Sequence, residues 1–312
     1  MAKVRKRHVD FAVYVAIRLM VAVLQALPLT TALRVADGLA WLVRQLDRRH
    51  RMVARENLNT AFPGQYSEAE TDELVKRVYR HFCRMMVEIL QLGRRVHTGN
   101  WRDYLEYGSP EQSRMALSAL LGERPILLVT AHFGNWELSG YIQALLGFKG
   151  YAIARPLDNP YLDAWLRRWR EERGQKIIAK KGEFDRIEDV LQAGNALATL
   201  GDQDAGARGL FVNFFNRPAS THKAIALLSI EHNVPIVVIV CARIAEPMFY
   251  RLYVEDVIEP SEYDQHLNPV KAITERFTNA LESLIRKHPE QYFWLHRRWK
   301  HQPPVKKAKK VA

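Results

Sequence analysis

Apolar residues are spaced differently in the two parts of the chain. Residues 31–46, 53–62 and 67–92 show helical spacing, and the third segment begins with Ser67-Glu-Ala-Glu70, which has the form of a capping box. Beyond Gly108, short and partly β-branched apolar runs alternate with helical stretches. This alternation predicts an α/β fold, with a mostly parallel central sheet that helices cover on both faces.

The alternating part of the chain predicts six strands and at least five helices. The strands are expected at 126–130, 151–154, 176–179, 196–200, 234–241 and 249–257. The helices are expected at 136–146, 160–173, 183–193 and 222–231, and a last one begins at Pro269. We therefore divide the chain into an N-terminal segment 1–30, a helical region 31–107 packed on the core, an α/β core 108–301, and a basic, disordered tail 302–312.

The first 30 residues combine charge and hydrophobicity in a way that favours a membrane. Four basic residues come first: Lys3, Arg5, Lys6 and Arg7. The apolar stretch 11–29 follows, and its length is near the roughly 20 residues that cross a bilayer. On a helix, Tyr14, Arg18 and Gln25 share one narrow polar stripe. Two interpretations stay open, a tilted membrane span and a helix lying in the cytoplasmic interface. A buried helix of a soluble core gives the basic cluster no use.

Composition and charge restrict the class of protein. The chain has 312 residues, 48% of them hydrophobic, which is too apolar for a disordered protein. Its net charge of +12 favours an anionic partner such as a lipid surface, an acidic carrier protein or nucleic acid. Two cysteines, Cys83 and Cys241, exclude a disulfide framework. The sequence has no nucleotide-binding glycine motif and no hydrolase elbow, so we expect neither a cofactor nor a metal.

A histidine and a glutamate stand at the end of the first long predicted strand. His132 follows the apolar run 126–130, and Gly134 permits a sharp turn before the helix that carries Glu137. Ligands of open α/β sheets bind beyond the carboxyl ends of the strands. Across such a turn, the Glu137 carboxylate can contact the imidazole and leave its other nitrogen as a general base. The pair is equally compatible with an ordinary helix start, because acidic residues favour the first turn.

Several short segments resemble the motifs of one enzyme family. They are 130–137 (TAHFGNWE), 154–160 (ARPLDNP), 201–204 (GDQD), 209–221 (GLFVNFFNRPAST) and 292–300 (YFWLHRRWK). In this order they resemble the lauroyl/myristoyl (late) acyltransferases of lipid A biosynthesis, within the H-x4-D/E glycerolipid acyltransferase superfamily. The resemblance covers almost the whole chain. Asn216 departs from it, since a glycine is common at that position.

The resemblance implies a glycerol-phosphate-acyltransferase-like fold and an enzyme at the cytoplasmic face of the inner membrane. Such an enzyme transfers a fatty acyl chain from an acyl carrier protein thioester to a hydroxyl of a lipid A precursor. His132 would be the base and Glu137 its orienting partner, in a direct attack that needs no cofactor. Six further residues are expected to contact the substrate: Arg155, Asn159, Arg173, Asp202, Gln203 and Asp204. We expect the two aspartates to hold Arg155 or acceptor hydroxyls rather than a metal.

Two other functions stay compatible with the sequence. Acyl-CoA could replace the carrier protein, and the acceptor could be another glycolipid such as a phosphatidylinositol mannoside, because the His/Glu core does not distinguish them. A non-catalytic basic protein would gather its cations on a recognition helix, whereas here they are spread over amphipathic helices and both termini. The basic segment 296–300, flanked by tryptophans, is compatible with a membrane interface or a solvated face. We expect an acyl donor, a lipid acceptor and a membrane as partners, and no nucleic acid.

Overall fold

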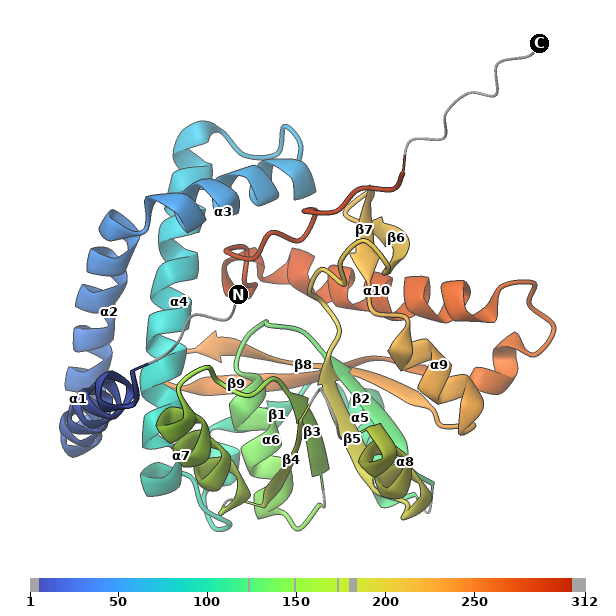
Figure 1. The fold of residues 1–312 in the computed structure, drawn as a ribbon, viewed down its shortest axis with the longest axis horizontal. Helices are drawn as coiled ribbons and strands as arrows, with labels where there is room; N and C mark the ends of the chain where they lie inside the picture. The colour runs from blue at the N-terminus through green and yellow to red at the C-terminus, as the bar shows by residue number, and fades with distance from the viewer. Residues whose placement is uncertain (1–5, 123, 149, 173, 180–183, 305–312) are drawn as a thin grey trace.

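A seven-stranded sheet crosses the molecule in the computed structural model, and helices pack on both of its faces (Figure 1). The structure describes residues 6–122, 124–148, 150–172, 174–179 and 184–304. Three features expected from the sequence lie outside these residues: the basic pair Lys3 and Arg5, the candidate Arg173, and the tail beyond residue 304.

The first part of the chain is helical, as predicted. It forms α1 (Arg7–Ala26), α2 (Leu29–Leu46), α3 (Arg48–Ala61) and α4 (Glu68–Arg95). The capping box is present at the start of α4, where Ser67 and Glu70 each bind the other's backbone N–H. Asp47 separates α2 from α3, and its side chain caps α3 by accepting from the backbone N–H of His50 at 3.2 Å. The other three helices all pack against the long helix α4, which is therefore the centre of the helical region.

The central sheet confirms the predicted α/β class. Its strands are β1 (Leu105–Tyr107), β2 (Ile126–Thr130), β3 (Gly150–Ala154), β4 (Gln175–Ala179), β5 (Ala196–Leu200), β8 (Ile236–Ala245) and β9 (Phe249–Ile258). The order across the sheet is β1-β9-β8-β2-β5-β3-β4. Strands β8, β2, β5, β3 and β4 run parallel to one another. Strand β9 is antiparallel to β8, and β1 runs parallel to β9. The sheet is therefore mostly parallel, with a reversed pair at one edge.

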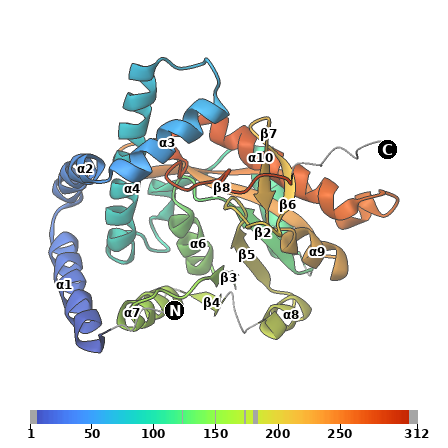
Figure 2. The same ribbon diagram turned by 45° about the horizontal axis from the view of Figure 1, so that its top comes forward.

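Helices follow most of the strands and cover the sheet. They are α5 (Pro110–Leu121), α6 (Trp136–Leu145), α7 (Pro160–Glu171), α8 (Phe184–Gln192), α9 (Ala224–Glu231) and α10 (Pro269–Lys287). Helix α6 lies on one side of β2 and β5, and α9 and α10 lie on the other (Figures 1 and 2). A separate antiparallel hairpin, β6 (Leu210–Phe214) and β7 (Arg217–Thr221), stands beside α10. The hairpin, β1 and α5 are not among the predicted elements.

The sheet opens between β3 and β5. These two strands are paired only from Gly150 to Ala152, opposite Ala196 to Ala198. In contrast, β2 and β5 stay in register up to Thr130 and Leu200. The last residues of β3 therefore diverge from the last residues of β5, and this separation leaves room for a cavity at the carboxyl ends of the strands.

Helix α1 is long and apolar enough to cross a membrane, as judged by length and composition, and it is the only such helix among the described residues. It does not project from the molecule. It packs against α4 and α7, and only a small share of its most apolar stretch is buried. The predicted polar stripe is present and faces these two helices: Arg18 contacts Tyr14 and Trp165, and Gln25 binds the backbone of α4.

Candidate active site

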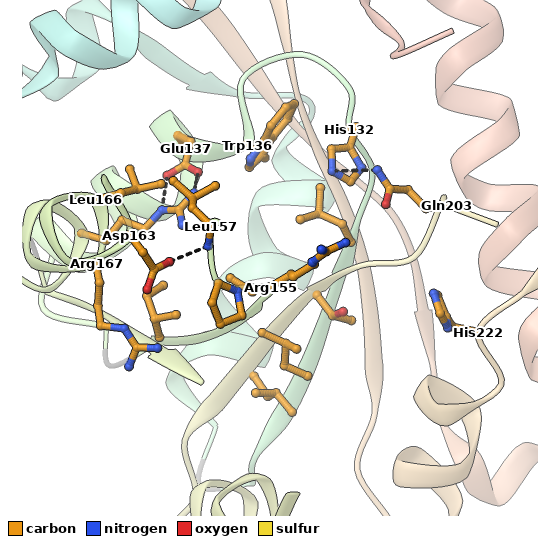
Figure 3. A pocket seen from close by; sticks show the side chains of 18 of the residues that line it. His132, Trp136, Glu137, Arg155, Leu157, Asp163, Leu166, Arg167, Gln203 and His222 are labelled. Atoms are coloured by element: carbon orange, nitrogen blue, oxygen red, sulfur yellow. Dashed lines mark hydrogen bonds and ion pairs between the residues drawn. The ribbon is translucent and has the colours of Figure 1, made fainter. Parts of the chain in front are cut away.

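A cavity of about 550 Å³ lies where β3 and β5 separate. Buried apolar side chains form part of its wall: Leu127, Ile177, Ile187, Leu197, Ile225 and Leu228. Polar and charged side chains also line it, among them His132, Glu137, Arg155, Asp163, Arg167, Arg170, Gln203 and His222 (Figure 3). An apolar channel with a few convergent polar groups is typical of a site for a small or amphipathic ligand.

His132 and Asp202 come from the ends of two neighbouring strands. The Nδ1 atom of His132 lies 2.9 Å from Oδ1 of Asp202, whose side chain is only 4% exposed. Because Thr130 and Leu200 are paired across β2 and β5, the residues two positions beyond each of them lie side by side. The carboxylate accepts the proton of Nδ1, so Nε2 keeps its lone pair and faces the cavity.

The two groups shift each other's pKa. Burial favours the neutral imidazole, but the charge of Asp202 and its hydrogen bond outweigh burial and raise the pKa of His132 above its ordinary value. Burial likewise opposes the charge on Asp202, yet the charge of His132 and its hydrogen bonds lower the pKa of Asp202. The carboxylate is therefore ionised at neutral pH, and His132 is a stronger base than a free histidine.

The backbone of the loop that carries His132 is held from several directions. Gly134 has a φ of +59°, and a Cβ atom there would stand 1.8 Å from the carbonyl oxygen of Cys241. The backbone N–H of Gly134 donates to Gln291 O at 3.0 Å, and Phe293 N–H donates to His132 O at 3.0 Å. Only a residue without a side chain fits between the loop and β8, which explains the glycine.

Helix α4 supplies one further contact to this loop. Nε2 of His81 lies 3.1 Å from the carbonyl oxygen of Gly134, and the His81 side chain is buried. Burial, together with the nearby charge of Arg243, lowers the pKa of His81 to about 3. The ring is therefore neutral, and the Nε2–H group donates to the loop carbonyl. His81 is not recognisable as a site residue from the sequence, because it lies on the buried face of an ordinary amphipathic helix.

Glu137 has a different partner from the one that the sequence suggests. Arg170 of α7 donates to both Glu137 oxygens, with Nε at 3.2 Å from Oε2. The ring of Trp136 stands between Glu137 and His132 in Figure 3, and its centroid lies 5.2 Å from that of His132. The direction of α6 aims Glu137 at α7 rather than back at β2. The expected contact of Glu137 with His132 is therefore wrong, and Asp202 takes that place.

Gln203 lies beside the other nitrogen of the imidazole. Its Nε2 atom is 3.4 Å from Nε2 of His132, and both side chains line the cavity (Figure 3). The amide therefore occupies the position from which a substrate hydroxyl would reach the base. Of the three residues of the segment 202–204, Gln203 is the one whose side chain contacts both the base and the cavity.

Two other residues expected to contact the substrate, Asn159 and Asp204, form hydrogen bonds within the protein. Asn159 caps α7 by accepting from the backbone N–H groups of Tyr161 and Leu162, and its Nδ2 donates to Asp10 O at 2.8 Å. Asp204 accepts from Nδ1 of His301 at 2.7 Å, and the cavity wall does not include its side chain. Both side chains thus bind polar groups of the protein, and neither lines the cavity.

Arg155 does line the cavity, but neither aspartate holds it. Its Nη2 atom lies 3.4 Å from Oδ1 of Asp158, and its side chain is 80% exposed. Arg155 is therefore a largely exposed cation at the rim of the cavity, and it is not held beside His132. The expectation that Asp202 and Asp204 hold it is wrong.

A charged stripe on α7 was not recognised in the sequence. Asp163, Leu166, Arg167 and Arg170 all line the cavity, and their spacing of three and four residues places them on one helix face. That spacing was the available signal. It places Arg170 on the same helix face as Asp163 and Arg167.

The basic segment 296–300 is divided between core and surface, because Arg298 and Trp299 are buried whereas Arg297 and Lys300 are exposed. Arg298 is 2% exposed and donates to Ser220 O at 2.6 Å and to Thr221 Oγ1 at 2.7 Å. Trp294 and Trp299 are also buried, which contradicts a membrane-facing or solvated role for these three residues. The charge of Arg298 further lowers the pKa of Asp202. Arg298 therefore supports the ionised state of the carboxylate that holds His132.

Nothing in the described parts of the chain forms a group of three or more His, Cys, Asp or Glu side chains suited to a metal ion. What the arrangement offers is a base with an ionised partner, a row of arginines and an apolar channel. These groups can activate a hydroxyl and hold a long apolar chain next to it.

Comparison with known proteins places the chain among acyl-transferring enzymes. The lipid A biosynthesis lauroyltransferase of Escherichia coli is 27% identical over 288 residues, 89% of this chain and 88% of that protein. The lipid A biosynthesis palmitoleoyltransferase of the same organism is 26% identical, over 84% of this chain and 82% of its own. A lipid A biosynthesis acyltransferase of Haemophilus influenzae is also 26% identical, over 90% and 88%.

A model of one protein family matches nearly the full length, from residue 2 to residue 301. The match includes α1, the sheet and every residue of the cavity described above. The chain is therefore an acyltransferase, and it belongs to the bacterial lipid A biosynthesis acyltransferase family.

Proposed function

We propose that this enzyme transfers a fatty acyl chain from an acyl carrier protein thioester to a hydroxyl of a lipid A precursor. The observation that carries the proposal is the His132–Asp202 pair on the wall of an apolar cavity. The names of the relatives supply the acceptor class. The net charge of +12 suits an acidic carrier protein, since opposite charges steer the encounter of two proteins.

The reaction needs one proton acceptor and no covalent intermediate. Nε2 of His132 removes the proton of the acceptor hydroxyl while its oxygen attacks the thioester carbonyl carbon. The tetrahedral intermediate then collapses, the C–S bond breaks, and the imidazolium returns the proton to the departing thiolate. Asp202 stabilises the imidazolium through Nδ1, as its position at 2.9 Å allows. A positioned base of this kind contributes roughly 100- to 10,000-fold to the rate.

Arginines at the cavity are suited to the negative charges of the reaction. Arg170 is the more ordered of two candidates, because Glu137 holds its guanidinium beside the cavity. We assign it to the oxyanion of the tetrahedral intermediate or to the position of the thioester. Arg155, exposed at the rim, is suited to a phosphate of the acceptor. In this assignment Glu137 acts through Arg170 and not through His132.

Membrane association at the cytoplasmic face completes the proposal. A lipid acceptor stays in the bilayer, so an enzyme that uses it gains from lying at the lipid surface. Helix α1 exposes most of its apolar side chains, and basic residues precede it. The positive-inside rule then favours the cytoplasmic side.

The test is a direct assay of the purified full-length protein. Acyl carrier protein thioesters and CoA thioesters of several chain lengths are offered together with lipid A precursors or other glycolipids, and products are identified by mass spectrometry. Acylated lipid A precursor formed from the carrier protein thioester is expected. Transfer only from CoA, or only to a phosphatidylinositol mannoside, would replace the donor or the acceptor proposed above.

The matched control is His132→Ala against Asn159→Ala. The first variant removes the proposed base and is expected to abolish transfer with unchanged thermal unfolding. The second removes a side chain from the same carboxyl edge that only holds α7 and α1 together. It is expected to lower stability and to retain turnover at temperatures where it is folded. Retained turnover in His132→Ala would overturn the mechanism.

A further inference from the structure

Helix α1 is fixed to the catalytic domain along its whole length. Near its start, the backbone carbonyl of Asp10 accepts from Asn159 at 2.8 Å. Near its middle, the guanidinium of Arg18 lies 5.3 Å from the ring centroid of Trp165. Near its end, Gln25 donates to Leu90 O at 2.9 Å. The first two partners belong to α7 or its cap and the third to α4.

This attachment is incompatible with a helix that crosses the bilayer. A 20-residue helix is about 30 Å long, close to the thickness of the hydrocarbon core. If α1 spanned that core, the helices attached to both of its ends would have to lie in hydrocarbon too. Helix α7 carries several charged side chains, including the exposed Arg168. Charged groups at the bilayer centre are strongly disfavoured.

The charges on both sides of α1 lead to the same conclusion. Arg7 stands at its start, and Arg34, Arg48 and Arg49 follow within the next two helices. Basic residues near a membrane helix stay on the cytoplasmic side. A single span would carry one of these two basic groups to the opposite side, whereas a helix lying in the interface keeps both on the same side.

The outer surfaces of α1 and α2 form one apolar face. Thirteen of the 22 exposed large hydrophobic side chains of the described residues lie on these two helices. The most exposed of the thirteen are Leu19, Val23, Trp41 and Leu46, each at 61% or more. In both views the two helices lie along the same outer edge of the molecule (Figures 1 and 2).

The charges on this face suit an anionic lipid surface. The acids of α1 and α2 are Asp10, which is buried, and Asp37, which pairs with Arg80 and Arg84. Arg7 of α1 and Arg34 of α2, by contrast, are exposed. An apolar face with basic residues beside it is the pattern of a helix that lies in the headgroup region of a bilayer.

The apolar face continues towards the cavity. Helix α1 bridges α4 and α7, and both of these helices contribute to the cavity wall. Met86 of α4 and Leu157, before α7, line the cavity and are 54% and 44% exposed. An acyl chain could thus move from the lipid surface into the cavity along apolar side chains, without entering water.

We propose that α1 and α2 together form a monotopic membrane face, with α1 lying in the plane of one anionic leaflet instead of crossing it. The inference deepens the proposed function, because it places the cavity mouth beside the leaflet that holds the acceptor. It does not depend on the reaction catalysed, since it concerns where the two ends of α1 lie.

The decisive test is whether the start of α1 and the catalytic domain that follows it face the same side of the membrane. In a Cys83→Ser background, His8→Cys and Pro303→Cys are introduced separately into the full chain, and inside-out membrane vesicles are treated with a membrane-impermeant maleimide. Both cysteines are expected to react from the outside of these vesicles. Protection of His8→Cys until detergent is added, with Pro303→Cys reactive, would show a span and overturn the proposal.

A second measurement tests the face itself. Leu19→Asp in α1 is compared with Leu121→Asp in α5, because the two leucines are 64% and 69% exposed. Binding to vesicles that contain phosphatidylglycerol is expected to weaken about tenfold for Leu19→Asp, the effect of losing one buried leucine. Leu121→Asp is expected to bind like the wild type. Equal binding of the two variants would overturn the assigned face, whereas an inactive enzyme with both expected results would overturn only the proposed function.

Discussion

The side chains of His132 and Asp202 meet at 2.9 Å although 70 residues separate them in the chain. The meeting follows from the order of the strands, because β5 lies directly beside β2 in the sheet. The buried carboxylate gives the imidazole a fixed tautomer and a raised pKa. Consequences for activity follow that can be measured with single substitutions.

Asp202→Asn should change both the rate and its pH dependence. His132 is inactive as a base while protonated, so kcat/KM rises with pH through its raised pKa. Loss of the carboxylate charge lowers that pKa and moves the acidic limb of the profile to lower pH. The maximal rate falls by about 100- to 10,000-fold, because the imidazolium loses its support. Asp204→Asn is the control, and an unmoved acidic limb in Asp202→Asn would contradict the pairing.

Glu137→Gln should act through Arg170. Loss of the carboxylate leaves a guanidinium of 19% exposure without its charged partner, which costs about 1–3 kcal/mol of unfolding free energy. Turnover should fall as well, while the acidic limb of the pH profile stays where it is in the wild type. The double variant Glu137→Gln/Arg170→Met should lose less stability than the two single losses added together. Additive losses in thermal unfolding would argue against this ion pair.

His81→Phe should lower kcat with little change in KM. The substitution removes the N–H group that holds the carbonyl of Gly134, and the loop carrying His132 then shifts. A displacement of about 1 Å can cost up to 100-fold in rate. His81→Gln keeps an N–H donor and should recover part of the loss in steady-state kinetics. A variant whose KM rises while kcat is unchanged would show that His81 has no positioning role.

Gly134→Ala should be more damaging than an alanine at another glycine of positive φ. At Gly134 the new Cβ would meet the backbone of β8, whereas Gly147 has a φ of +91° and open space around it. Both substitutions carry the conformational cost of roughly 1 kcal/mol, and only Gly134→Ala adds a backbone clash. Thermal unfolding and turnover measure the two contributions. Equal effects at the two positions would mean that the clash is relieved by a small shift.

The strands that precede His132 and Asp202 were predictable from the sequence. Residues 126–130 and 196–200 form β2 and β5 with the bounds expected from their apolar runs. Central strands of a parallel sheet are buried by helices on both faces, so their sequences are continuous apolar runs. The starts of two helices were predictable as well. Helices α7 and α10 both begin at a proline, which is common at the first position of a helix.

The hairpin of β6 and β7 was not predictable in the same way. Its turn consists of Phe215 and Asn216, with φ angles of +52° and +57°. Two-residue hairpin turns of this type usually contain glycine, and this one does not. Asn216, which departs from the family pattern, is therefore a turn residue in a conformation that asparagine tolerates better than most side chains.

The partner of His132 could be identified only from the structure. Glu137 is close in sequence, and local spacing alone could not show that Trp136 separates it from the imidazole. Asp202 was identified as a polar residue at a strand end, but its role depends on which strand lies next to β2. Strand order in a sheet is a long-range property, whereas the stripe of α7 that contains Arg170 is local and could have been read from helical spacing.

The opening between β3 and β5 divides the wall of the cavity into two sides. The His132–Asp202 pair lies on the β2–β5 side, where the strands stay in register to their ends. The opposite side of the cavity is made by β3, β4 and α7, and it includes the side chains of Ile153, Ile177 and Leu166. Under the proposed function, substitutions of these three apolar side chains are expected to reshape the space for a fatty chain and to leave the His132–Asp202 contact intact. If the cavity holds the acyl chain as proposed, its chain-length preference can therefore change while the base is retained.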